Sequence, residues 1–278
     1  MLAGTKPDPT AELRILSLGA GVQSTTLALM SARGDLPMVD CAIFADTGWE
    51  PAAVYRHLDW LETYLPYPVY RVARPGQDLG AHAIEIATAP VTRTASPPWF
   101  TDNPKGMLPR QCSKEFKTRA IGRKVRELLG LAPGKRGPRR KVVEQWLGIS
   151  RDEMQRMKDA EQPFVANCFP LVGLGMTRRD CKRWLVERQY REPPKSACIF
   201  CPYHTGDQWR DMRDNAPDDW AAACAFDDAI RPGFHGMPGS AFVHRSRVPL
   251  RDVDLSTSAD RGQLEFGFED ECEGICGT

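Results

Sequence analysis

Two cysteines near the carboxyl-terminal third of the chain are the residues best suited to chemistry. Cys198 and Cys201 lie in the sequence Ser196-Ala-Cys-Ile-Phe-Cys-Pro-Tyr-His204. Two thiolates in one tight turn can bind one metal centre, so this spacing suits an iron–sulfur cluster or zinc. Taken alone, the pair also suits a redox dithiol.

A second candidate for chemistry lies at residues 13–30, LRILSLGAGVQSTTLALM. An apolar run with the length of a buried strand gives way to small residues and then to a helix-compatible stretch. A strand, a Gly/Ser turn and a helix aim free backbone N–H groups at an anion, usually a phosphate. An ordinary tight turn between a strand and a helix is the alternative. The candidate contacts are Ser17, Gly19, Ala20, Gly21, Val22, Gln23 and Ser24.

Further polar candidates follow along the chain. Asp46, Thr47 and Gly48 follow closely after a second apolar run at residues 38–44. Lys117 and Arg119 lie on a basic helix expected at residues 114–129, and both could reach a phosphate through charge-assisted hydrogen bonds. A basic helix face exposed to solvent is the alternative for these two cations.

The elements that must position these residues alternate between strand and helix. Strands are predicted at residues 38–44, 69–72 and 141–149, besides the apolar run that opens at Leu13, and an extended segment at 164–171. Helices are predicted at 51–65, 114–129, 151–160, 176–189 with Thr177 or a neighbour as cap, and 209–230 with a break near Pro217. Residues 88–111 are predicted to form an ordered loop. This alternation favours a parallel α/β sheet, whose ligand lies at the carboxyl ends of the strands.

Composition narrows the class of protein. The 278 residues are 42% hydrophobic and 26% charged, with a formal net charge of +1, which is ordinary for a globular protein. Because neither a signal peptide nor a membrane span is evident, we expect a cytoplasmic protein without a membrane partner. Nine cysteines in that compartment favour metal binding or thiol chemistry over disulfides. The basic run at 135–141 could bind a nucleic-acid backbone, or it is a solvated loop.

The motifs together resemble a known superfamily. Residues 17–24 are similar to the PP-loop of the ATP pyrophosphatases, Ser-Gly-Gly-x-Asp-Ser, with Gln23 at the place of the aspartate. Asp46-Thr-Gly followed by Pro51 and Tyr55 resembles the sulfonucleotide reductase branch, which includes phosphoadenosine-phosphosulfate and adenosine-phosphosulfate reductases. Residues 148–153, with Arg156, occupy the place of a loop that faces the substrate in those reductases.

The resemblance implies a fold and a division of the chain. The fold is an α/β parallel sheet of the adenine nucleotide alpha hydrolase-like (PP-loop) type with an iron–sulfur-binding carboxyl-terminal segment. We expect a flexible terminus at 1–12, a nucleotide-binding domain at 13–190, and a cysteine-bearing segment at 191–278 packed on it. Asp46, Thr47 and Gly48 would contact the ribose, adenine or magnesium of the nucleotide.

The resemblance also implies a cofactor, an iron–sulfur cluster of the 4Fe-4S type. Cys112, Cys198 and Cys201 would be its ligands, with His204 or a cysteine of the tail as a fourth. Ser113 stands where iron–sulfur adenosine-phosphosulfate reductases have the second residue of a Cys-Cys pair. In tRNA-thiolating PP-loop enzymes, three cysteines bind the cluster and one iron has no protein ligand. That open iron holds the transferred sulfur.

The end of the chain carries two more candidates, Cys272 and Cys276. Sulfonucleotide reductases end in Glu-Cys-Gly-Ile/Leu-His, whose cysteine attacks the sulfonate. Here Glu273 is inserted and Cys276 takes the place of the histidine. Either cysteine is a candidate nucleophile, and a metal ligand or an irregular tail are the alternatives. Lys117 and Arg119 complete the catalytic candidates.

Three functions remain open from the sequence. In the first, ATP with Mg²⁺ adenylates an acceptor, which is a tRNA base, DNA or a small molecule, and sulfur transfer follows at the cluster. In the second, the protein reduces a sulfonucleotide to release sulfite. In the third, it is an inactive nucleotide- or cluster-binding regulator, which Gln23 keeps open. The donor of sulfur or electrons is not identified, and a homodimer is left open.

Overall fold

The centre of the molecule is a five-stranded sheet with the order β3-β2-β1-β6-β7. The computed structural model describes residues 4–88, 97–234, 237–256 and 260. The strands are β1 (Leu13–Ser17), β2 (Cys41–Asp46), β3 (Val69–Ala73), β6 (Val143–Leu147) and β7 (Val165–Cys168). All neighbouring pairs are parallel. The predicted parallel α/β sheet is therefore confirmed.

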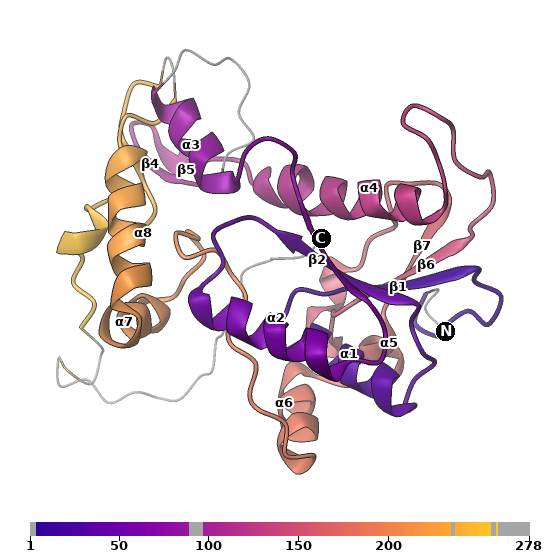
Figure 1. Ribbon diagram of the computed structural model, residues 1–278. Helices are drawn as coiled ribbons and strands as arrows, with labels where there is room; N and C mark the ends of the chain where they lie inside the picture. Colours follow the sequence, from indigo (N-terminus) through magenta and orange to yellow (C-terminus); the bar gives the residue numbers. More distant parts are fainter. Residues whose placement is uncertain (1–3, 89–96, 235–236, 257–259, 261–278) are drawn as a thin grey trace.

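Helices cover both faces of this sheet (Figure 1). Successive side chains of β1 point to opposite faces: Leu16 packs with α1 (Val22–Arg33), α2 (Ala52–Tyr64) and α6 (Arg178–Glu187), while Ile15 packs with α4 (Arg119–Leu128). A short helix, α5 (Pro170–Gly173), lies beside α1 on the first face. Because a strand buried on both faces cannot alternate apolar with polar residues, β2 is apolar along all but its last residue, Asp46.

A second apolar cluster lies beside the sheet, around Trp99, Trp209, Phe200 and Phe226. It is built from α3 (Leu79–Thr88), α7 (Gly206–Asn215), α8 (Pro217–Ala229) and a three-stranded antiparallel sheet. The strands of this sheet are β4 (Phe100–Asp102), β5 (Lys105–Met107) and β8 (Ala241–Phe242). Figure 1 shows α7, α8 and α3 together at one side of the molecule. Segments on both sides of β6 in the sequence thus share one core.

Several predicted helix boundaries are confirmed. Thr177 caps α6 through a capping box with Asp180, and Pro217 separates α7 from α8. The helix predicted at 114–129 begins as a π-helix, η1 (Ser113–Thr118), and continues as α4. The polar helix predicted at 151–160 is shorter, a 3-10 helix η2 (Arg151–Arg156). The loop predicted at 88–111 contains β4 and β5.

Among the residues that the structure describes, no helix has both the length and the apolar character that a membrane span needs.

Candidate functional site

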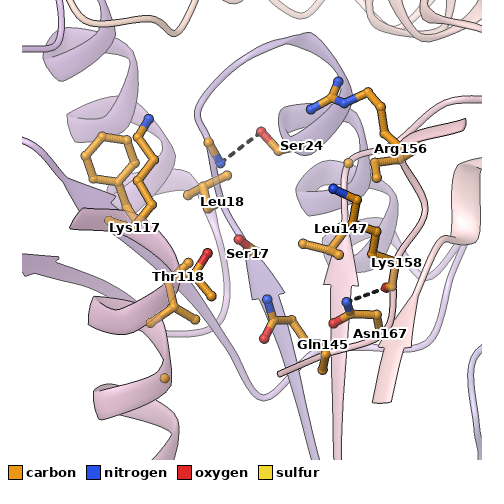
Figure 2. A pocket seen from close by; sticks show the side chains of 18 of the residues that line it. Ser17, Leu18, Ser24, Lys117, Thr118, Gln145, Leu147, Arg156, Lys158 and Asn167 are labelled. Carbon is orange, nitrogen blue, oxygen red and sulfur yellow. Dashed lines mark hydrogen bonds between the residues drawn. The ribbon is translucent and has the colours of Figure 1, made fainter. Parts of the chain in front are cut away.

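A cavity of about 600 Å³ opens at the carboxyl ends of β1, β2 and β6 (Figure 2). Leu18 and Gly19, which follow β1, line it together with Gly148, which follows β6. β1 and β6 are adjacent at the centre of the sheet. Beyond β1 the strand order continues with β2 and β3 on one side, and beyond β6 it continues with β7 on the other. Crevices at such a reversal of strand order are where ligands bind in open α/β sheets.

The loop between β1 and α1 is shaped to leave its backbone accessible. Ala20 adopts a left-handed conformation with φ of 59° and is fully buried. The backbone N–H of Gly19 donates to the Ser24 hydroxyl at 3.2 Å, and that hydroxyl donates to the Gly21 carbonyl at 3.3 Å. Among the described residues, no side chain caps α1, whose first N–H groups carry partial positive charge. The predicted order of strand, small-residue turn and helix is present, and phosphate binding at this turn stays a prediction.

Gly148 fixes the position of this loop. A Cβ atom at Gly148 would lie 2.8 Å from the backbone nitrogen of Ser24 and 3.1 Å from its Cα. The backbone that follows β6 therefore touches the first turn of α1 directly, and only glycine allows this approach.

Basic side chains surround the cavity. They come from the π-helix, α4, the segment after β6, the start of α6 and the segment before the cysteine pair: Lys114, Lys117, Arg119, Arg123, Arg126, Arg156, Lys158, Arg178 and Lys195. The cavity-lining acids are fewer: Glu153, Asp159 and Glu161. An excess of one sign in a cleft concentrates ligands of the opposite sign. The cavity is therefore suited to an anion.

The remaining walls of the cavity are apolar or neutral. Ala45 from β2 packs with Ile121 and Val125 from α4, and Phe44, which points to the other face of the sheet, also lines the cavity. On the other side, Gln145 and Asn167 are paired positions of β6 and β7. Figure 2 shows these two amides side by side, with the Asn167 amide donating to the Lys158 carbonyl at 2.8 Å. Apolar surface with a few polar groups is typical of a site for a small organic ligand.

Gln23 lies in the first turn of α1 and is only 8% exposed. Its amide nitrogen donates to a carboxylate oxygen of Glu153 at 3.1 Å and lies 3.5 Å from the Ser150 hydroxyl. Glu153 in turn forms an ion pair with Arg156. Gln23, Glu153 and Arg156 all line the cavity.

Lys117 connects the large cavity to a second, smaller one. Its ammonium group donates to the Glu50 carboxylate at 3.0 Å, and the Glu50 side chain is fully buried. The second carboxylate oxygen of Glu50 lies 3.4 Å from the Ser196 hydroxyl. Arg119 forms a partly exposed ion pair with Glu115. Both predicted cations therefore line the large cavity, and Lys117 lines the small one as well.

The small cavity, about 30 Å³, is lined by Cys112, Cys198 and Cys201. The structure thus brings together the three cysteines that the sequence singled out. The Thr47 hydroxyl lies 3.2 Å from the Cys198 sulfur. As these side chains stand, no group of three or more His, Cys, Asp or Glu in the described part of the chain is arranged to hold a metal ion. The donor set itself, three thiols in one cavity, is the kind that soft metal centres take.

His204 supports the cysteine turn. Its Nε2 lies 3.0 Å from the carbonyl oxygen of Cys198, and its ring packs edge-on against Trp209 with the ring centroids 4.7 Å apart. Burial lowers the pKa of His204 to about 4. The imidazole is thus neutral at physiological pH, and its Nε2 hydrogen bonds to the turn that carries both cysteines.

Asp46 is held in the turn after β2, outside the lining of the large cavity. Its carboxylate accepts hydrogen bonds from the Tyr55 hydroxyl at 2.8 Å and from the Gly48 N–H at 2.7 Å. Burial, followed by the bond to Asp46, raises the pKa of Tyr55. Its role toward a nucleotide stays a prediction. The tail candidates Cys272 and Cys276, together with the irregular segment expected at 264–278, lie outside the described residues.

Some residues of the site carried no signal in the sequence. Glu50, Gln145, Asn167 and Lys195 are isolated polar residues whose place depends on contacts with distant segments. Glu50 follows Asp46-Thr-Gly by two residues, and that proximity was the available hint. The other three could be found only from the fold.

Comparisons with known proteins extend this description. No protein-family model and no curated protein matches the sequence. Among solved structures, the chain is similar to phosphoadenylyl-sulfate (PAPS) reductase from Candida auris in its phosphate complex. The identity is 12%, the TM-score is 0.43, and the match covers 67% of this chain and 76% of that one.

Proposed function

We propose that the large cavity binds an adenine nucleotide and that the protein is an adenine-nucleotide-dependent enzyme of sulfur chemistry. In its reaction, ATP adenylates an oxygen of an acceptor and pyrophosphate leaves; hydrosulfide from a sulfide-level donor then forms a C–S bond with the acceptor as the C–O bond to AMP breaks. The supporting observation is the shared wall of the two cavities. Lys117 lines both the phosphate-loop cavity and the cavity of the three cysteines.

The chain's own groups can stabilise the charge that develops during adenylation. Negative charge grows on the leaving pyrophosphate, and the uncapped N-terminus of α1 and the Lys117 ammonium are fixed donors at this cavity. Donors that are already oriented stabilise such charge without reorganising. Mg²⁺ bound with ATP would neutralise phosphate charge, and the Asp159 carboxylate, which lines the cavity, would be a protein ligand for it.

The apolar part of the cavity suits the base of the nucleotide. Phe44, Ala45, Ile121 and Val125 form apolar surface beside the phosphate loop, and burial of a planar base against such surface excludes water. The phosphates and the base would thus occupy different parts of one cavity.

Cys112, Cys198 and Cys201 are the residues that would hold an iron–sulfur cluster. The cluster, when bound, supplies an iron that can carry a sulfur atom. Ser113 is buried and its hydroxyl is bonded to the Arg110 guanidinium, so the place of a fourth cysteine is taken by a group that does not ligate iron. This difference favours sulfur transfer over reduction of a sulfonucleotide, in which Cys272 or Cys276 would be the nucleophile.

The test uses protein purified without oxygen and incubated with ATP and Mg²⁺, with and without candidate acceptors. We expect AMP and pyrophosphate in equal amounts, and iron with sulfide in the protein. Arg56→Gln, an exposed position on α2, is the control for loss of one positive charge, and Lys117→Gln should lower the yield. Sulfite released from a sulfonucleotide, and abolished by Cys272→Ser or Cys276→Ser, would establish the reductase instead. Iron-free protein that forms neither AMP nor sulfite would contradict both enzymes.

A further inference from the structure

We infer that Gln23 is a positioning residue, which holds Glu153 against Arg156 so that the Arg156 guanidinium binds the terminal phosphates of the nucleotide. This inference rests on the proposed nucleotide site and adds a second anion contact to its phosphate loop. The ligand class is a pyrophosphate group, free or at the end of a nucleotide.

The first support is the burial and bonding of the Gln23 amide. Gln23 is the second residue of α1, and its amide nitrogen contacts Glu153 at 3.1 Å and the fully buried Ser150 at 3.5 Å. An amide can donate two hydrogen bonds, and both partners here lie more than a hundred residues away. Gln23 therefore ties the first turn of α1 to the segment that follows β6.

The second support is the burial of Arg156 and the incomplete hydrogen bonding of its guanidinium group. The Glu153 and Arg156 side chains are each 14% exposed, so their ion pair is well shielded from water. The Nε of Arg156 is buried and has no hydrogen-bond partner among the described residues. A buried donor without a partner is costly, and in an anion cavity a phosphate oxygen would satisfy it. Figure 2 shows Arg156 beside Ser24, on the side of the loop away from Lys117.

The third support is charge. An aspartate at position 23 would place a second carboxylate next to Glu153 in a shielded site, where like charges repel strongly. It would also compete with Glu153 for Arg156 and reduce the positive charge left for a phosphate. A neutral donor at position 23 is what Glu153 and Arg156 require. The Ser-Gly-Gly-x-Asp-Ser pattern has an aspartate where this chain has Gln23. Here Glu153, which lies on η2, supplies a carboxylate next to that position instead.

The test measures the affinity of the full chain for inorganic pyrophosphate and for ATP by calorimetry. Arg156→Gln should weaken both by about tenfold or more, as expected for loss of a charge-assisted hydrogen bond. Gln23→Asp should weaken them as well, and the exchanged pair Gln23→Asp with Glu153→Gln should recover most of the loss. Arg56→Gln serves as the control, because it removes one positive charge from an exposed position on α2, outside the cavity.

The outcomes separate the inference from the proposed function. Wild-type protein that binds neither pyrophosphate nor ATP would remove the nucleotide site and the inference with it. Wild-type protein that binds both, with Arg156→Gln unchanged or Gln23→Asp tighter, would overturn the inference alone. Thermal unfolding of each variant shows whether it is folded, and recovery in the exchanged pair is a result that a simple loss of stability would not give.

Discussion

At the scale of single residues, Gly148 is the position at which the structure most directly requires one type of residue. A methyl group there would lie 2.8 Å from the Ser24 backbone nitrogen, and neither backbone can yield without moving the phosphate loop. We expect Gly148→Ala to lower the free energy of unfolding by about 1–3 kcal/mol, the usual cost of overpacking. ATP affinity should fall more than stability alone explains, because the N–H groups of α1 move. Denaturant unfolding and calorimetry measure the two effects.

Gly206 provides the control for that substitution. It is the first residue of α7, and no described atom lies within 4 Å of the Cβ it would gain. Gly206→Ala should leave both stability and ATP affinity near their wild-type values. Equal ATP affinity in Gly148→Ala and Gly206→Ala would show that the contact with Ser24 does not position the loop.

The residues of the phosphate loop could be predicted from the sequence, whereas their partners could not. Small residues between an apolar run and a helix are a local pattern, so Ser17 to Ser24 were found without a structure. Gln23 looked like a defect in that pattern, because its partner Glu153 is 130 residues further along the chain. A hydrogen bond between two elements is a property of their packing, and no local spacing encodes it.

At the scale of elements, one buried aspartate holds the end of α8 to the segments around it. The Asp227 side chain is fully buried. It accepts hydrogen bonds from the Val243 N–H at 2.8 Å and the Leu250 N–H at 2.9 Å, and it pairs with Arg231. Asp227→Ala would leave two buried N–H groups and a guanidinium without their partner. We expect a loss of about 3–5 kcal/mol in unfolding free energy, measured by denaturant titration.

The neighbouring Asp228 is the matched control. Its side chain is 47% exposed and pairs with Arg251 on the surface, and such pairs contribute about 1 kcal/mol or less. Asp228→Ala should therefore change stability little. A similar loss in both variants would mean that the buried hydrogen bonds of Asp227 add nothing to the surface charge effect.

Elements with strong local signals were predicted, and elements without them were not. α6 was expected from its apolar spacing and its cap at Thr177, and the capping box with Asp180 bears this out. β4 and β8 have three and two residues, too few for an alternating pattern to stand out. Their pairing joins residues about 140 positions apart, which a pass along the chain cannot detect.

At the scale of the whole molecule, buried histidines should make stability depend on pH. Burial lowers the pKa of His57 from 6.5 to about 4 and lowers those of His82 and His244, as it does for His204. Because each takes up a proton more readily once unfolded, their contribution is complete above about pH 6.5 and falls as the pH is lowered; that of His57 is lost as the pH falls to about 4. His57→Gln should reduce the slope of unfolding free energy between pH 4.5 and 6.5 by up to about 1.4 kcal/mol per pH unit. An unchanged slope would show that His57 does not titrate on unfolding.

The arrangement of the two cavities was only partly accessible from the sequence. The sheet and the loop at its edge follow from alternating strands and helices. Cys112 was joined to Cys198 and Cys201 through resemblance alone, because the segments that carry them meet only in the folded core around Trp99 and Phe200. That core, which α3 also enters, brings the π-helix against the cysteine turn and so puts Lys117 between the cavities.

Lys117 is both a structural and a functional residue in this arrangement, and a pair of variants can separate the roles. Lys117→Met would leave the fully buried Glu50 side chain charged and without its cation, at a cost of about 3–5 kcal/mol in unfolding free energy. Adding Glu50→Gln removes that charge and keeps a group that can bond to Ser196, so most of the stability should return. Affinity for ATP should not return, because the cation between the phosphate loop and the cysteines is still missing. Recovery of stability and affinity together would show that Lys117 acts only as the partner of Glu50.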